Sequence, residues 1–154
     1  MLSMKAKYGL RALLYLARQQ NQEEPVLISE LAEKEKIPKK FLELILLDLK
    51  NHGLLQSKKG KGGGYLLSRR PEAIKLGRVV RVLDGPIAPL PCASQTAYIP
   101  CDECEDEKTC GIRLVMKDVR DATAKILDGT SLADVLRRVE EASTQPAEAL
   151  TYHI

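Results

Sequence analysis

The sequence is poor in aromatic residues and has no long apolar run. It contains no tryptophan, one phenylalanine and five tyrosines among 154 residues. Because stacking on bases needs aromatic side chains, this shortage argues against a platform for single-stranded nucleic acid. No apolar run approaches the roughly 18–20 residues that span a bilayer. The N-terminal stretch also lacks the pattern of a signal peptide, since charges interrupt its apolar residues. We therefore expect a cytoplasmic protein with no membrane partner.

Charge is distributed unevenly along the chain. The net charge is only +3. Residues 1–80 carry 16 Lys and Arg against 8 Asp and Glu, whereas residues 81–154 carry 8 against 13. The basic half is therefore a candidate for binding a polyanion, and the acidic half is not.

The first half of the chain shows helical periodicity broken by turn residues. One helix is expected over residues 3–20, and a short second helix follows with Ser29 as its N-cap. Pro38 suits the first turn of a third helix, because proline lacks the N–H that a helix start does not use. That third helix runs to about Asn51, and Gly53 stops it.

Two short β-type runs follow, over residues 54–57 and 65–68. They flank a basic, glycine-rich tip, which is typical of a hairpin. Three helices followed by a basic hairpin predict a winged helix-turn-helix. The expected fold class is mainly α with a small β-wing, in which a DNA-binding domain is joined to a long dimerisation helix.

The predicted DNA interface combines the start of the third helix with the wing. A recognition helix enters the major groove by its N-terminal end, which here holds Pro38, Lys39 and Lys40. The lysines suit phosphates, and Glu43 can accept a hydrogen bond from cytosine N4. At the wing tip, the residues that reach phosphates or the minor groove are Lys58, Lys59 and Lys61. The alternative is a solvated, lysine-rich loop on an ordinary helical domain.

All four cysteines lie close together in the chain, at Cys92, Cys101, Cys104 and Cys110. Such clustering favours a metal, a cluster or redox chemistry, and the two-residue gap from Cys101 to Cys104 is typical of metal ligands. Four thiolates could close a zinc site, or three could bind while one is spare. Incidental thiols are the alternative. The surrounding acidic residues disfavour thiolates unless a cation compensates.

A long helix is predicted over residues 110–128. Its apolar residues step by 3, 4, 3 and 4, which gives a seam of about two heptads. Such a seam favours a symmetric dimer that presents two recognition helices to a palindromic operator. The seam consists of Ile112, Val115, Val119, Ala122 and Ile126.

The remaining segments complete the expected domain organisation. A helix is predicted over residues 71–84, and a last helix over 132–142 is capped by Ser131. We expect a winged helix-turn-helix domain over residues 1–84, a cysteine-containing sensor loop over 85–109, a dimerisation helix and C-terminal helix over 110–142, and a flexible tail over 143–154.

Three stretches carry a resemblance to a known family. They are KYGLRALLYLA, IPKKFLELILLDLKNHGLLQSKKGKGGGYLLSRRP and CGIRLVMKDVRDATAKILDGTSLADV. These resemble the Rrf-two family of IscR-like bacterial winged-helix regulators over about residues 3–140. The wing pattern is the most specific part, and it adds Ser57, Gly63 and Tyr65 to the candidate DNA-binding residues.

The resemblance implies a cytosolic homodimer that binds palindromic double-stranded DNA. Many members hold an iron–sulfur cluster through three cysteines, to which Cys92, Cys104 and Cys110 correspond in position. Cys101 is additional, so it could replace Cys92 or serve as a fourth ligand. Lysine also stands where the family's wing carries an arginine, which keeps the phosphate charge but loses a bidentate contact.

Together, these observations predict a dimeric transcription regulator that senses iron, oxygen or redox state through an iron–sulfur cluster, either [2Fe-2S] or [4Fe-4S]. An alternative keeps the DNA binding but places zinc or a thiol/disulfide switch on the cysteines. A thiol redox enzyme is a third class, and we expect no such activity because its usual βαβ context is missing.

Overall fold

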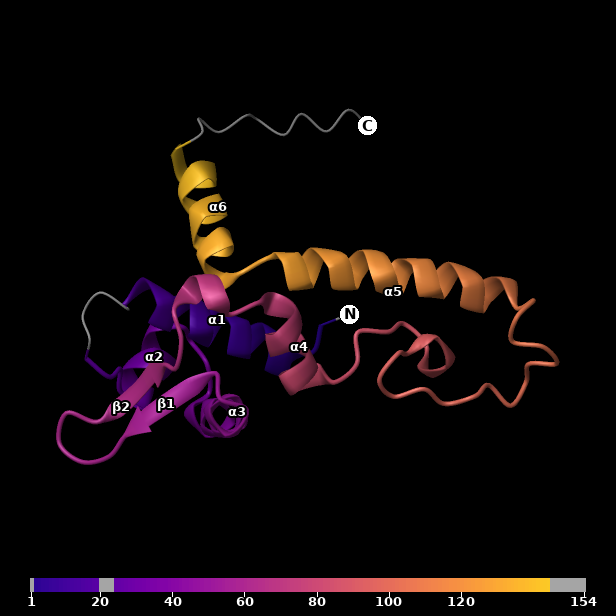
Figure 1. Ribbon diagram of the computed structural model, residues 1–154. Helices are drawn as coiled ribbons and strands as arrows, with labels where there is room; N and C mark the ends of the chain where they lie inside the picture. Colours follow the sequence, from indigo (N-terminus) through magenta and orange to yellow (C-terminus); the bar gives the residue numbers. More distant parts are fainter. Residues whose placement is uncertain (1, 20–23, 145–154) are drawn as a thin grey trace, which may run out of the picture.

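A helical body carries a small β-hairpin on one side and a long projecting helix on another (Figure 1). The structure is a computed structural model that describes residues 2–19 and 24–144. Its elements in chain order are α1 (Met4–Arg18), α2 (Ile28–Lys34), α3 (Lys39–Asn51), β1 (Leu55–Lys58), β2 (Gly64–Leu67), the 3₁₀ turn η2 (Pro71–Ala73), α4 (Leu76–Asp84), the 3₁₀ turn η3 (Pro91–Ala93), α5 (Gly111–Gly129) and α6 (Leu132–Thr144).

Helices α1, α3 and α4 pack against one another around one hydrophobic core. The four buried residues of α3 recur at helical spacing, so one face of this helix lies in the core and the other faces outward. They are Leu42, Ile45, Leu46 and Leu49. Val79 and Leu83 from α4 join the same core.

The hairpin of β1 and β2 is antiparallel, with Leu55 opposite Leu67 and Lys58 opposite Gly64. A third segment extends it, because Val26 and Tyr65 exchange two backbone hydrogen bonds of 3.0 and 2.8 Å. The stretch before α2 therefore ties β2 to the helical body at Tyr65, the residue opposite Ser57.

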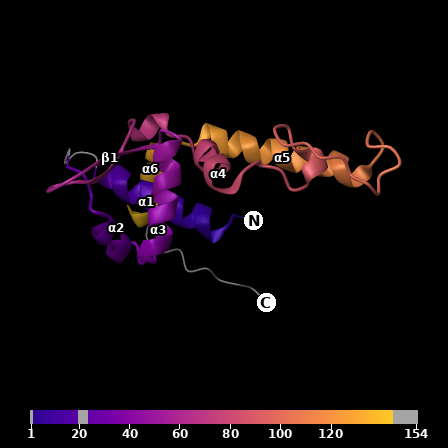
Figure 2. The ribbon, with the colours of Figure 1, turned by 90° about the horizontal axis from the view of Figure 1, so that it is seen from below.

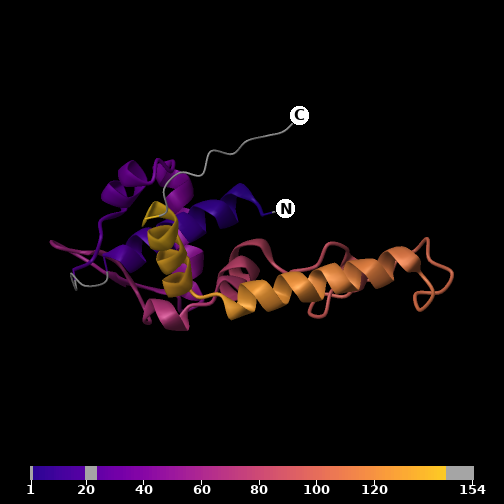
Figure 3. The ribbon, with the colours of Figure 1, turned by 90° about the horizontal axis from the view of Figure 1, so that it is seen from above.

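Helix α5 projects away from the body, and the segment between α4 and α5 runs alongside it (Figures 1, 2 and 3). The C-terminal end of α5 is tied to α4: Arg81 Nη1 and Nη2 donate to the two carboxylate oxygens of Asp128 at 2.6 and 2.9 Å. The amide of Leu76 also donates to the Thr130 carbonyl at 2.9 Å. One end of the projecting helix is thus held firmly against the body.

Helix α6 packs on α1 and η2, and its Leu132 is fully buried in the common core. It therefore packs with the helical body rather than along α5, the helix with which the sequence grouped it. Its N-terminus is capped as predicted, because the Ser131 hydroxyl accepts from the Asp134 amide at 3.1 Å. The helix continues to Thr144, and the rest of the predicted tail, residues 145–154, lies outside the described residues.

Two local predictions were wrong. Helix α2 begins at Ile28 with Leu27 at its N-cap, so Ser29 lies inside the first turn. The helix predicted over 71–84 is interrupted, because Ile74 and Lys75 are extended and pair with the segment after α5. None of the helices that the structure describes has the length and apolar character to cross a membrane.

Candidate nucleic-acid interface and cysteine loop

The start of α3 is exposed and positively charged. Pro38 occupies the N-cap, and Lys39, Lys40 and Glu43 all point to solvent, since the core takes the opposite face of the helix. The positive end of the helix dipole adds to the charge of the two lysines. This end of α3 is therefore suited to a phosphate backbone, with Glu43 one turn further along.

The wing presents the second basic group. Lys58, Lys59 and Lys61 are exposed at the hairpin tip. The hairpin lies beside α3, since α3 contacts β1 (Figure 1). Helix α3 and the wing are therefore neighbours on the surface of the body.

The three wing residues taken from the family pattern are less exposed than the lysines. Ser57 is half-buried, and the side chain of Tyr65 packs against the hydrophobic core. Gly63 is buried, and a Cβ there would collide with the carbonyl of Lys58. Gly63 and Tyr65 therefore also shape and anchor the wing.

Within the cysteine loop, the structure brings Cys104 and Cys110 together. A hydrogen bond with Cys110 raises the pKa of Cys104 to about 11. Cys110 is the N-cap of α5, and hydrogen bonds from backbone amides, that of Arg113 first, lower its pKa. The pair therefore has one thiol with thiolate character at the helix N-terminus and one that stays protonated.

The other two cysteines lie in different surroundings. Cys101 is exposed, and its charge adds to the rise in the pKa of Cys104. Cys92 is buried in η3. Over residues 2–19 and 24–144, no three His, Cys, Asp or Glu side chains converge as a metal site. The structure thus supplies two adjacent thiols of the four predicted ligands. A cluster fits these residues only if Cys92 or Cys101 moves toward that pair.

Two arginines of α5 that the sequence did not single out tie the loop to the helix. Arg113 Nε donates to the Cys92 carbonyl at 2.9 Å. Arg120 is buried, donates to the Ala93 carbonyl, and pairs with Asp121 at 2.6 Å. The only sequence signal was their spacing of seven, which places both on one face of α5. The turn that carries Cys92 is thus fixed to α5 at two points.

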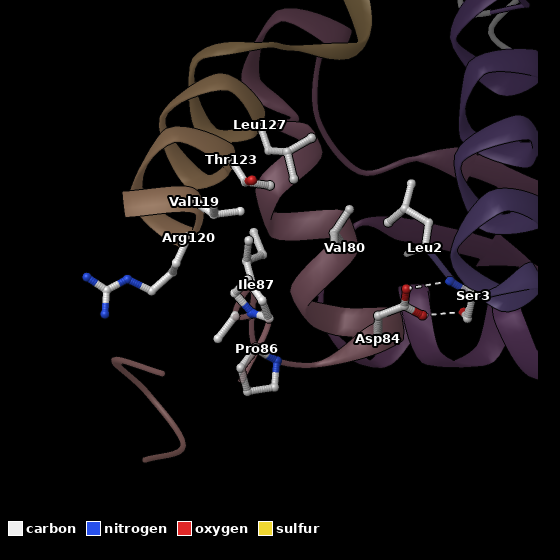
Figure 4. A pocket seen from close by; sticks show the side chains of 12 residues that line it. Leu2, Ser3, Val80, Asp84, Pro86, Ile87, Val119, Arg120, Thr123 and Leu127 are labelled. Carbon is white, nitrogen blue, oxygen red and sulfur yellow. Dashed lines mark hydrogen bonds between the residues drawn. The ribbon is translucent and has the colours of Figure 1, made fainter. Parts of the chain in front are cut away.

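The apolar seam of α5 is exposed. Ile112, Val115, Val119 and Ile126 are all more than two-fifths exposed, and Ala122 is also exposed. Beside it lies a hollow of about 780 Å³ between the start of α1, the end of α4 and α5 (Figure 4). Its lining is largely apolar and includes Leu2, Val80, Ile87, Val119 and Leu127. The seam and the hollow form one continuous apolar surface at Val119.

The fold and the exposed basic residues define a winged helix-turn-helix transcription regulator, and comparisons with known proteins agree. The family model described as "Rrf2: Iron-dependent Transcriptional regulator" matches residues 2–138. The chain therefore belongs to the Rrf2, or Rrf-two, family. It is a DNA-binding regulator rather than an enzyme, as the sequence predicted.

Relatives cover most of the chain. An rrf2-like HTH-type transcriptional regulator of Rhodobacter capsulatus is 44% identical over 138 residues, which cover 88% of this chain and 92% of the relative. The solved structure of CymR, the global cysteine regulator of B. subtilis, matches with a TM-score of 0.73 and 31% identity, covering 90% of this chain and 97% of CymR. IscR of T. potens also matches with a TM-score of 0.73, at 29% identity and 96% and 93% coverage.

Proposed function

We propose that this protein is a cytoplasmic homodimer that binds a palindromic operator and adjusts its DNA affinity through an iron–sulfur cluster held by the cysteine loop. The observation that carries the sensing part is the adjacency of Cys104 and Cys110 at the start of α5. The matching family model is described as iron-dependent, and a structural neighbour is an IscR. The DNA part is supported by the exposed lysines of α3 and the wing.

Dimerisation is supported by the exposed seam on α5. Isolated apolar side chains on a surface are ordinary, but a contiguous apolar surface of this kind marks an interface. A second copy that lays its own α5 across this one would cover the seam and fill the hollow beside Val119. Two DNA-binding bodies would then be held at a fixed separation, as a palindrome requires.

Cluster binding assigns ligand roles within the loop. Cys104 and Cys110 are the first two ligands. Cys92 is the third by the family resemblance, with Cys101 as its substitute or a fourth. A bound cluster would supply sensitivity to iron, oxygen or redox state. Arg113 and Arg120 hold the Cys92 turn against α5, so any change in the loop reaches the dimerisation helix.

One observation favours a second candidate function. Because Cys104 and Cys110 lie close enough to shift each other's pKa in opposite directions, an oxidant could convert them to a disulfide, taking two electrons and releasing two protons. A neighbouring solved structure is described as the oxidized form of Staphylococcus aureus CymR. Zinc held by the same thiols is the remaining form of this alternative.

The sensing proposal is tested by anaerobic purification followed by visible absorption spectra and iron, sulfide and zinc analysis. We expect Cys104→Ser and Cys110→Ser each to abolish the visible band. Cys92→Ser should weaken it strongly, and Cys101→Ser less. A full band in both of the first two variants would rule out the cluster site. Zinc without iron, or a Cys104–Cys110 disulfide that alone changes DNA affinity, would establish the second candidate.

The DNA interface is tested by the salt dependence of binding. Each phosphate contact removed should reduce the slope of log affinity against log salt by roughly 0.9. We expect Lys58→Ala, Lys59→Ala and Lys61→Ala to reduce it additively. Lys125→Ala, an exposed lysine of α5, is the matched control. An unchanged slope in the triple wing variant would remove the wing from the interface.

A further inference from the structure

The outward face of α3 carries two leucines that the core does not use. Lys40, Glu43, Leu44 and Leu47 follow the spacing i, i+3, i+4, i+7, so they form one exposed stripe. Leu44 is 60% exposed and Leu47 is 48% exposed, whereas the opposite face of the same helix is fully buried. The stripe is basic at its start and apolar towards its end.

A helix that lies in a major groove presents one such stripe to the base edges, and homeodomain recognition helices use the same spacing. A leucine side chain has no hydrogen-bond donor or acceptor, so it cannot read the polar pattern of a base pair. The apolar group that the major groove offers is the C5-methyl of thymine. The lysines of α3 and the wing supply the charge that holds a duplex against this face.

We propose that Leu44 and Leu47 read thymine methyl groups, so that the operator half-site places thymines beneath this part of α3. Glu43 stands beside Leu44 in the stripe, and its carboxylate suits cytosine N4. The expected half-site therefore combines a cytosine with neighbouring thymines. This inference rests on the DNA interface proposed above.

The test begins with a random duplex pool from which the full-length protein selects its preferred sequence. That sequence is then remade with deoxyuridine in place of thymidine, which removes only the methyl groups. We expect the wild type to bind the deoxyuridine duplex about fourfold more weakly for each buried methyl. The Leu44→Ala, Leu47→Ala double variant should bind the two duplexes equally, since it has lost the groups that sense the difference.

Val139→Ala on α6 is the matched control, because Val139 is 46% exposed and α6 lies on the other side of the body from α3 (Figure 1). It should discriminate as the wild type does. Equal wild-type binding to both duplexes, or full discrimination by the double variant, would overturn the thymine contact while leaving DNA binding intact. Selection of no preferred sequence would overturn the DNA interface and the thymine contact together.

Discussion

At the residue scale, Lys36 in the turn between α2 and α3 has an unusual backbone. Its φ is +51°, a left-handed conformation that costs a non-glycine residue roughly 1–2 kcal/mol. Glycine removes this cost but loses about 0.5–1 kcal/mol of chain entropy. We therefore expect Lys36→Gly to raise the free energy of unfolding by about 0.5–1 kcal/mol in urea titrations. Lys34→Gly, in helix α2, removes the same charge and should lower stability; equal effects would contradict the prediction.

Gly64 is the first residue of β2 and lies opposite Lys58, at the end of the strand pair next to the wing tip. Its φ is +145°, and a Cβ there would collide with the Val26 carbonyl that accepts the Tyr65 amide. Gly64→Ala should therefore cost about 2–4 kcal/mol, since it combines strain with the loss of backbone hydrogen bonds. Hydrogen exchange of the Tyr65 amide should accelerate.

Gly60→Ala is the control for this change. Gly60 also has a positive φ, of +88°, but open space surrounds its Cβ position. The substitution should cost about 1–2 kcal/mol, the backbone strain alone. If Gly60→Ala and Gly64→Ala destabilise equally, the contact between Gly64 and Val26 contributes nothing.

At the scale of elements, the Arg81–Asp128 ion pair joins α4 to α5. The hydrogen bonds from Arg81 lower the pKa of Asp128 below its ordinary value of 3.8. This stabilisation is complete above that ordinary value and is lost as pH falls through the lowered folded-state pKa. Both side chains are more than a third exposed, so the pair contributes only about 0.5 kcal/mol.

Asp128→Asn should therefore reduce stability at pH 7 by about 0.5 kcal/mol, and the difference should fade at low pH. Urea unfolding at several pH values measures this. Asp118→Asn, an exposed carboxylate of the same helix, is the control and should show no such pH-dependent difference. A difference that persists in acid would indicate lost packing rather than lost charge.

The elements that local patterns specify were predictable, and those that depend on distant partners were not. Helix α3 followed from its apolar spacing and Pro38, and the Ser131 cap followed from a serine before a helical run. The interruption of the predicted 71–84 helix at Ile74 could not be predicted from local sequence, because it depends on pairing with residues more than fifty positions away. Ser29 was taken as the N-cap from residue type alone, whereas the N-cap of α2 is Leu27, two residues earlier.

In the candidate site, too, some features follow from local sequence patterns and others depend on distant contacts. The exposed lysines and the pair Cys104 and Cys110 follow from charge, spacing and family pattern. Chain proximity also suggested that Cys101 would join Cys104; in the structure Cys110 has the largest effect on the pKa of Cys104, and Cys101 adds a smaller one. The attachment of the Cys92 turn by Arg113 and Arg120 depends on how the loop folds back along α5, which no local pattern specifies.

At the scale of the whole molecule, Val119 lies where the α5 seam meets the hollow. In the proposed dimer, Val119→Asp places two carboxylates across the two-fold axis, which costs several kcal/mol. Sedimentation should show monomers, and operator affinity should fall with them. Asp118→Asn leaves the seam intact and should remain dimeric. An unchanged Val119→Asp dimer would place the interface elsewhere.

Cys110 caps the N-terminal end of α5, a helix of 19 residues that is about 28 Å long, whereas the C-terminal end of α5 is held against the DNA-binding body. The body's hydrophobic core forms from α1 to α4 and α6, and no residue of the loop belongs to it. Substitutions in the loop therefore leave the folding of the body largely undisturbed. The chemistry of the cysteines along α5 can therefore change while the DNA-binding module keeps its fold.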